Sequence, residues 1–154
     1  MKKTFYTILW CAFAVYLLAL VWLLFLNRPV GFSMSISEYF KKTANIVPLR
    51  TIIRYVTAYS YGYAKLSVTN LLGNFLLFLP MGALLPCLFK RVNKFYKVVI
   101  IVAATVLLVE ILQGLLRVGT PDIDDFILNL SGAMLGYAIW NIPFINKTIK
   151  KISE

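Results

Sequence analysis

The sequence contains no histidine, two cysteines, and only six acidic residues against sixteen lysines and arginines. Without histidine, the chain lacks the commonest general base and the commonest ligand of transition metals. Cys11 and Cys87 lie singly within apolar runs. Isolated cysteines in such runs more often behave as small buried hydrophobic residues than as a disulfide, a zinc site or a nucleophile. The cysteines therefore support no redox role.

Charged residues are also scarce. They make up 14% of the 154 residues, whereas hydrophobic residues make up 60%. A soluble domain has roughly 45 to 50% apolar and about 25% charged residues, so this composition indicates a protein embedded in lipid. The net charge of +10 comes from lysines and arginines in short segments between apolar runs, as is typical of juxtamembrane charges. We expect the lipid bilayer as partner and no nucleic acid.

Four apolar runs are long enough to be membrane helices: residues 5–26, 66–89, 98–116 and 126–145. The first carries no charge and measures about 33 Å as a helix, against a hydrocarbon core of roughly 30 Å. It lacks the small-residue cleavage site of a signal peptide, so we interpret it as an uncleaved anchor. Pro80 and Pro86 predict a bent or re-entrant second span. The sequence thus predicts one all-α integral membrane domain, residues 1–154, with about four transmembrane helices.

The connection between the first two runs contains an amphipathic pattern. Apolar residues recur at helical spacing after Pro48, at Leu49, Ile52, Ile53 and Val56, and Arg50 and Arg54 lie on another face. This pattern predicts a helix over residues 49–60 that lies on the membrane surface. Packing of the same helix against the bundle is an equally weighted alternative.

The distribution of positive charge predicts the orientation. Nine lysines and arginines lie in short segments that are cytoplasmic if both termini are cytoplasmic. The remaining seven lie mainly in the long connection, and long connections translocate with less regard to charge. We therefore expect both termini inside and the loop around residues 117–125 outside.

Residues 110–136 hold four of the six acidic residues: Glu110, Asp122, Asp124 and Asp125. A carboxylate near the bilayer centre costs about 2.5 to 3.5 kcal/mol, so it usually faces the bundle interior and has a partner. Glu110, Gln113 and Arg117 share one helical face, with Glu110 about 10 Å inward of Arg117. We expect Glu110 to receive a hydrogen bond from Asn70, Asn74 or Gln113, or to stay protonated.

A second polar face begins after Thr120, which suits an N-cap, and Pro121, which suits the first helical position. Residues at spacings of three and four then share one face, namely Asp122, Asp125, Asn129, Gly132 and Gly136. The glycines allow another backbone to approach closely. Asn70 and Asn74, one turn apart in the second run, either pack helices together or complete this polar cluster.

The chemistry of the cluster has three interpretations. Arg117 bridging Asp122 or Asp125 would lock the last hairpin as a structural element. Oxygens of Asp122, Asp125 and Asn129 would suit a divalent cation, and Arg117 would hold a phosphate on a lipid-linked substrate. In the third interpretation the carboxylates act as general acid or base, with Glu110, Asp122 and Asp125 as the catalytic candidates. No cofactor is otherwise expected.

Three ordered blocks resemble the VanZ-like family of bacterial membrane proteins. They are NIVPLRTI (residues 45–52), NLLGNFLLFLPMG (residues 70–82) and EILQGLLRVGTPDIDDFILNLSGAMLGY (residues 110–137). The family's polar pattern falls on Asn45, Pro48, Asn70, Gly73, Asn74, Pro80, Gly82, Glu110, Gln113, Arg117, Asp122, Asp125, Asn129, Gly132 and Gly136. The resemblance implies a small multi-span protein of the bacterial cytoplasmic membrane, whose namesake is associated with teicoplanin resistance.

Together these features suggest a cell-envelope protein that binds an anionic lipid or lipid-linked glycan precursor at the outer leaflet. The predicted ligand-binding residues are Arg50, Arg54, Asn70, Asn74, Glu110, Gln113, Arg117, Asp122, Asp125 and Asn129. An enzyme that modifies such a lipid is one alternative. A structural subunit that binds another membrane protein through Gly132 and Gly136 is another.

Overall fold

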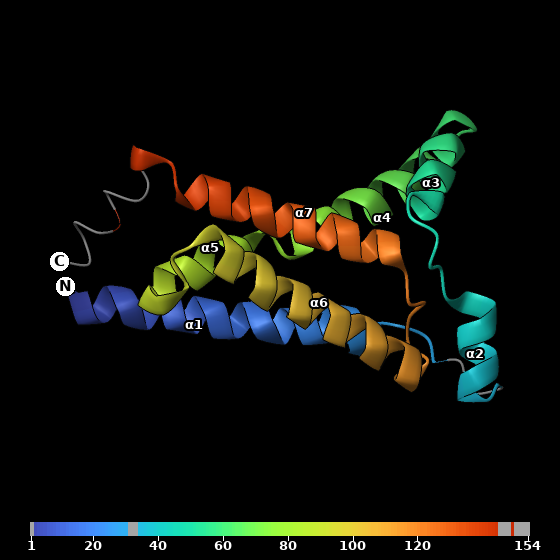
Figure 1. Ribbon diagram of the computed structural model, residues 1–154, viewed down its shortest axis with the longest axis horizontal. Coiled ribbons are helices and arrows are strands. Elements are labelled where there is room, and N and C mark those ends of the chain that lie inside the picture. The colour runs from blue at the N-terminus through green and yellow to red at the C-terminus, as the bar shows by residue number, and fades with distance from the viewer. Residues whose placement is uncertain (1, 31–33, 145–148, 150–154) are drawn as a thin grey trace.

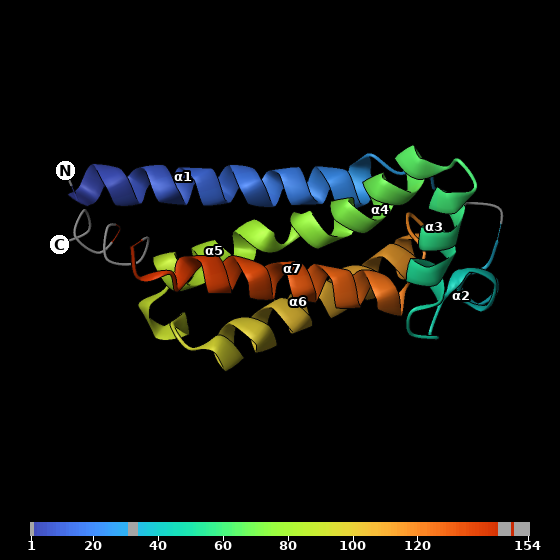
Figure 2. The ribbon, with the colours of Figure 1, turned by 90° about the horizontal axis from the view of Figure 1, so that it is seen from above.

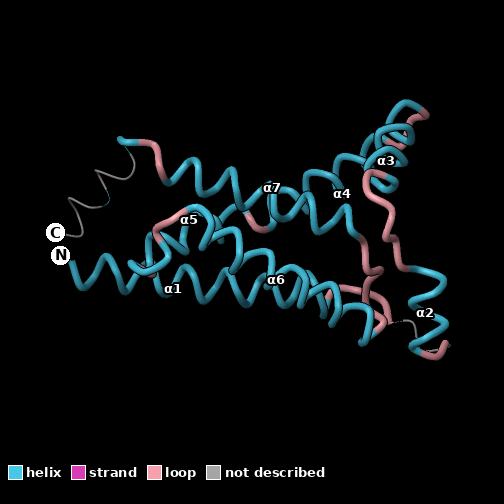
Figure 3. The backbone as a smooth tube through the Cα atoms, viewed as in Figure 1, coloured by secondary structure: helices cyan, strands magenta, loops and turns pink. Residues whose placement is uncertain are grey.

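The computed structural model describes residues 2–30, 34–144 and 149, and long helices run side by side through it (Figure 1). Short loops join the helices (Figure 3). The helices are α1 Lys2–Val21 with a π-helical end Trp22–Leu26, α2 Ile36–Thr43, α3 Arg50–Ser60, α4 Ala64–Leu77, α5 Leu79–Leu88, a 3₁₀ turn Lys90–Val92, α6 Phe95–Leu116 and α7 Ile123–Trp140. The described chain is therefore all-helical, as predicted.

Three helical segments are long and apolar enough to cross a membrane: Lys3–Leu26, Ser67–Leu88 and Phe95–Leu116. They correspond to the first three predicted runs, so the prediction of a helical membrane protein is confirmed. The fourth run corresponds to α7, which begins three residues earlier than predicted and ends at Trp140. Residues 145–148, at the end of that run, lie outside the described residues.

The second apolar run forms two helices that follow one another along the bundle (Figure 2). The break is at Phe78, whose side chain is fully buried, and Pro80 lies in the first turn of α5. Because Pro80 has no backbone N–H, a continuous helix would lose a hydrogen bond here. The Tyr16 hydroxyl of α1 donates to the carbonyl of Leu77 at 2.8 Å and so pairs a backbone group at the break.

Helix α7 packs against α4, α5 and α6. Its glycines contact backbone directly: a Cβ atom added to Gly132 would lie 1.7 Å from the Phe75 oxygen, and one added to Gly136 would lie 2.0 Å from the Leu79 oxygen. From the opposite side, a Cβ atom on Gly82 would lie 1.9 Å from the Ala133 oxygen. The close backbone approach predicted for Gly132 and Gly136 is present, and it positions the start of α7.

Helices α2 and α3 lie at the end of the bundle opposite the start of α1 (Figures 1 and 2). Helix α3 matches the amphipathic helix predicted over residues 49–60. It contacts α4 and α7, while Ile53 and Val56 stay 60% and 55% exposed. An apolar face that the protein leaves uncovered is consistent with a helix at a membrane surface.

Helix α2 was not predicted from the sequence. Its first turn carries a capping box in which Ser35 Oγ accepts from the Glu38 N–H at 3.3 Å. In return, a Glu38 carboxylate oxygen accepts from the Ser35 N–H at 3.0 Å. This serine and glutamate three residues apart are the readable signal for a helix start.

Candidate functional site

A buried carboxylate attaches α3 to the first turn of α7. Asp124 has no exposed surface, and its oxygens accept backbone N–H groups of Leu49 at 2.5 Å, Thr51 at 2.6 Å and Ile52 at 3.2 Å. These donors are the orphan N–H groups at the amino end of α3, where the helix dipole favours negative charge. Leu49 has a left-handed φ of 67°. Asp124 thus holds α3 in place and stabilises the unusual backbone at its start.

Asp122 caps α7 and joins three segments. One carboxylate oxygen accepts from the Asp124 N–H at 2.8 Å and from the Asn45 amide at 2.9 Å, and the other accepts from the Thr51 hydroxyl at 2.6 Å. The prediction of Thr120 as the N-cap is wrong, because Thr120 is exposed and the cap is Asp122. Pro121 lies in the loop and not at the first helical position, since α7 begins at Ile123.

The backbone of Asn45 pairs with the same loop. Its N–H donates to the Pro121 oxygen at 2.8 Å, and its carbonyl accepts from the Ile123 N–H at 3.0 Å. Together with the Asn45 side chain, these bonds connect the segment between α2 and α3 to the start of α7. The family block around residues 45–52 therefore lies against the block around residues 110–137.

Glu110 lies below this loop on α6 and is 8% exposed. One of its carboxylate oxygens accepts from the backbone N–H of Asp122 at 2.9 Å. Two of the three expected donors have other partners, because Asn74 donates to Asp125 and Gln113 donates to the Leu24 carbonyl. Glu110 does face the bundle interior as predicted, and the donor to this one oxygen is a backbone N–H.

Gln113 and Arg117 connect α6 to the first part of the chain. The Gln113 amide donates to the Leu24 carbonyl at 2.9 Å, in the π-helical end of α1 where backbone carbonyls are offset from the regular α-helical pattern. The Arg117 guanidinium donates to the Met34 carbonyl at 2.6 Å. Arg117 also ends α6 with a left-handed φ of 57°.

Arg28, in the loop after α1, lies near enough to Glu110 and Asp125 for its positive charge to act on both carboxyl groups. The sequence had suggested Arg117 as a partner of Asp122 or Asp125 and had not suggested Arg28. Arg28 was missed because it lies more than eighty residues before the carboxylates, and no helical periodicity relates them. The structure therefore adds Arg28 to the polar site.

Asn70 and Asn129 lie beside the network on α4 and α7. Asn70 is half-buried on α4, one turn before Asn74. Asn129 is 4% exposed on α7, one turn after Asp125, and no described residue hydrogen-bonds to its side-chain oxygen. In the described part of the chain, no group of three or more histidine, cysteine, aspartate or glutamate side chains has an arrangement that would hold a metal ion.

Positive charge dominates the exposed surface at this end of the bundle. The exposed cations are Arg28, Lys41, Lys42, Arg50, Arg54 and Lys65. Glu38 is the one exposed acidic residue in the part of the chain that the structure describes, and its hydrogen bonds with Ser35 lower the pKa of its carboxyl group. Because the other acids are turned inward and hydrogen-bonded, the surface that α2 and α3 present is basic.

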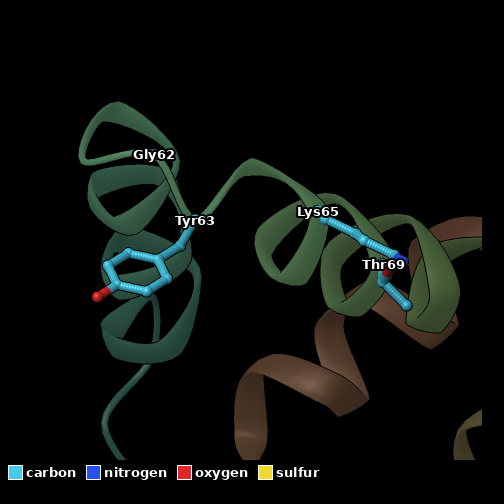
Figure 4. Close-up of a pocket in the computed structure, with 4 residues that line it drawn as sticks. All are labelled: Gly62, Tyr63, Lys65 and Thr69. Atoms are coloured by element: carbon cyan, nitrogen blue, oxygen red, sulfur yellow. The ribbon is translucent and has the colours of Figure 1, made fainter.

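Two hollows lie near this surface. One, of about 410 Å³, lies at the corner between α3 and α4 beside Lys65 and Thr69, whose side chains lie next to each other, while the Tyr63 ring points away from them (Figure 4). The other, of about 360 Å³, lies between α6, the start of α7 and the segment after α2, and Glu110 is part of its wall.

Comparisons with known proteins identify the family of this chain. The model of the VanZ/LLP1 family matches residues 13–145. Among curated proteins, Protein VanZ of Enterococcus faecium is 25% identical over 141 residues, which are 92% of this chain and 78% of that protein. No solved structure matches the chain. The family match spans every helix that contributes to the polar site, and the chain belongs to the VanZ/LLP1 family.

Proposed function

We propose that this protein is a VanZ-like protein of the bacterial cell envelope that binds the phosphate of an anionic lipid or lipid-linked glycan precursor and thereby affects susceptibility to glycopeptide antibiotics such as teicoplanin. The observation that supports a phosphate ligand is the separation of charge at the α2–α3 end. Four carboxyl groups are buried or half-buried in hydrogen bonds, and six cations are exposed around them.

Helix α3 is the part of this surface best suited to a lipid headgroup. Arg50 and Arg54 are one turn apart and exposed, and Ile53 and Val56 are exposed beside them. A basic amphipathic helix binds anionic lipids by placing its apolar residues at the acyl boundary and its cations at the phosphates. In this arrangement the buried carboxylates have a supporting role, because they hold α3 against the bundle.

The proposal includes a topology with α7 as the fourth crossing. At 18 residues α7 is about 27 Å long, close to the thickness of a hydrocarbon core. The start of α1, the 3₁₀ turn and the end of α7 share one end of the bundle (Figure 2). The positive-inside rule assigns this end, with its short basic segments, to the cytoplasm. Helices α2 and α3 then lie at the outer leaflet.

Lipid titration of the purified protein tests this proposal. In neutral detergent, native mass spectrometry would count molecules of phosphatidylglycerol or of a polyisoprenyl diphosphate bound to the full chain, with phosphatidylcholine as the neutral lipid. A basic residue near an anionic surface contributes about 1 kcal/mol, so the double variant Arg50→Gln/Arg54→Gln should bind roughly thirtyfold more weakly. The matched control is Lys90→Gln/Arg91→Gln, which removes two exposed cations at the other end.

Equal losses in the two double variants, or equal binding of phosphatidylcholine, would refute a phosphate site on α3. Preference for the polyisoprenyl diphosphate over phosphatidylglycerol would identify the precursor as the ligand. In cells, the α3 variant should lose any effect on teicoplanin susceptibility while its membrane level stays normal.

A further inference from the structure

The hollow beside Glu110 is a lateral crevice with a mostly apolar wall. It has a volume of about 360 Å³, within the range of roughly 300 to 1,000 Å³ of small-molecule sites. Leu107 and Ile111 of α6 form part of its wall and are 54% and 46% exposed, so the crevice opens on the face that α6 presents to lipid. A molecule would enter it from the membrane, beside Phe126 of α7.

Glu110 supplies an unused acceptor to this crevice. One of its carboxylate oxygens is occupied by the Asp122 N–H, and no described residue donates to the other. The side chain is 92% removed from solvent, since only 8% of its surface is exposed, and it forms part of the crevice wall. The other oxygen lies in a mostly apolar wall, so a ligand that carries a donor would supply a hydrogen bond that the protein does not provide.

The surrounding charge specifies the kind of donor. Hydrogen bonds link Glu110 to Asp122 and Asp122 to Asp124, and Asp125, which pairs with Asn74, is close enough for its charge to act on Glu110. Arg28 is near enough for its positive charge to act on Glu110 and Asp125. A phosphate would be repelled by these carboxyl groups. A hydroxyl would donate a neutral hydrogen bond, whereas an ammonium group would donate a stronger, charge-assisted bond and would balance an ionised carboxylate.

We propose that the crevice binds an amphiphile that carries a primary ammonium group on an apolar chain. The ammonium group donates to the free oxygen of Glu110, and the chain lies along Leu107, Ile111 and Phe126. This site takes the opposite charge from the basic surface of α3 and is separate from it. The ammonium proposal does not depend on the phosphate proposal.

Photo-crosslinking tests the site on the full chain in phosphatidylcholine nanodiscs. The probe is a dodecylamine with a diazirine in its chain, and the competitors are unlabelled dodecylamine, dodecanol and dodecyl phosphate. Labels should concentrate in peptides that contain Leu107, Ile111 and Phe126. Since a charge-assisted hydrogen bond is about twice as strong as a neutral one, dodecylamine should compete about tenfold better than dodecanol.

Three variants complete the test. Glu110→Gln keeps an oxygen for the Asp122 N–H but removes the charge, and should lower labelling about tenfold. Ala44→Phe fills the crevice from its wall without altering Glu110 and should abolish labelling. Glu38→Gln removes an exposed acid of α2 and should have no effect.

Equal competition by dodecanol would overturn the ammonium specificity. Labels spread evenly over the lipid-facing helices would overturn the site itself. Unchanged labelling of a folded Glu110→Gln protein would have the same consequence. If that variant unfolds, retained labelling of a folded Ala44→Phe protein decides against the proposal.

Discussion

Replacing Asp124 with asparagine should release α3 from the bundle without unfolding the membrane helices. The carboxylate of Asp124 accepts three backbone N–H groups at the start of α3, and two of these bonds are 2.6 Å or shorter. Asparagine retains one acceptor oxygen and turns an amide group, itself a donor, toward the remaining N–H groups. Each buried donor left without a partner costs about 1 to 3 kcal/mol, and bonds to a charged group are the stronger ones. We therefore expect α3 to be about 3 kcal/mol less firmly attached.

Amide hydrogen exchange of the purified protein measures this attachment directly. A change of about 3 kcal/mol in local opening corresponds to roughly 150-fold faster exchange at the Thr51 and Ile52 amides. Asp125→Asn is the matched control. It removes one carboxylate from the same helical turn, but the partner of Asp125 is Asn74 of α4 and not the start of α3. It should leave the Thr51 amide protected. Slow exchange in Asp124→Asn, or equal acceleration in both variants, would refute the role of Asp124.

Three further predictions follow from the packing, the topology and the acidic network. Gly132→Ala should lower the melting temperature in detergent, because its new Cβ atom would lie 1.7 Å from a backbone oxygen of α4; overpacking of this kind costs about 1 to 3 kcal/mol. Gly73→Ala, where no atom lies within 4 Å, should not lower it. On a background without the native cysteines, Thr120→Cys should react with an impermeant maleimide from outside intact cells and Asn93→Cys should not; the reverse pattern would invert the topology. Because Asp122 already accepts three hydrogen bonds, chelation of magnesium should leave the melting temperature unchanged, whereas stabilisation by magnesium would indicate a cation site.

The helices were predictable because their signals are local. Apolar runs of about twenty residues predicted the three apolar helices, and the spacing of Ile53 and Val56 predicted α3. Pro80 predicted the interruption between α4 and α5. A local signal for α2 was also present in Ser35 and Glu38, three residues apart, and was not used.

The sequence indicated which part of the chain forms the polar cluster, but it did not predict the hydrogen-bond partners. Helical periodicity grouped Asp122 with Asp125 and left out Asp124, although Asp124 is the acid with no exposed surface. Helical periodicity does not predict the partners of Asp124, because a residue in the first turn of a helix can contact a segment beyond the end of that helix. For Asp124 this segment is the start of α3. The partners of Asp124 are more than seventy residues earlier in the chain, and Arg28 is farther still from Glu110. One sequence contains no information on which distant segments meet.

The same distant pairing has a consequence for how the protein is made. The segment from Asn45 to Thr51 leaves the ribosome long before its partners, since Asn45 and Asp122 are 77 residues apart. Until the last hairpin is inserted, the amino end of α3 has no carboxylate to accept its N–H groups. Helices α2 and α3 should therefore reach their final position only as the last step of membrane insertion. A nascent chain released before α7 would leave them without their anchor, as a form that quality-control proteases of the membrane can distinguish from the finished protein.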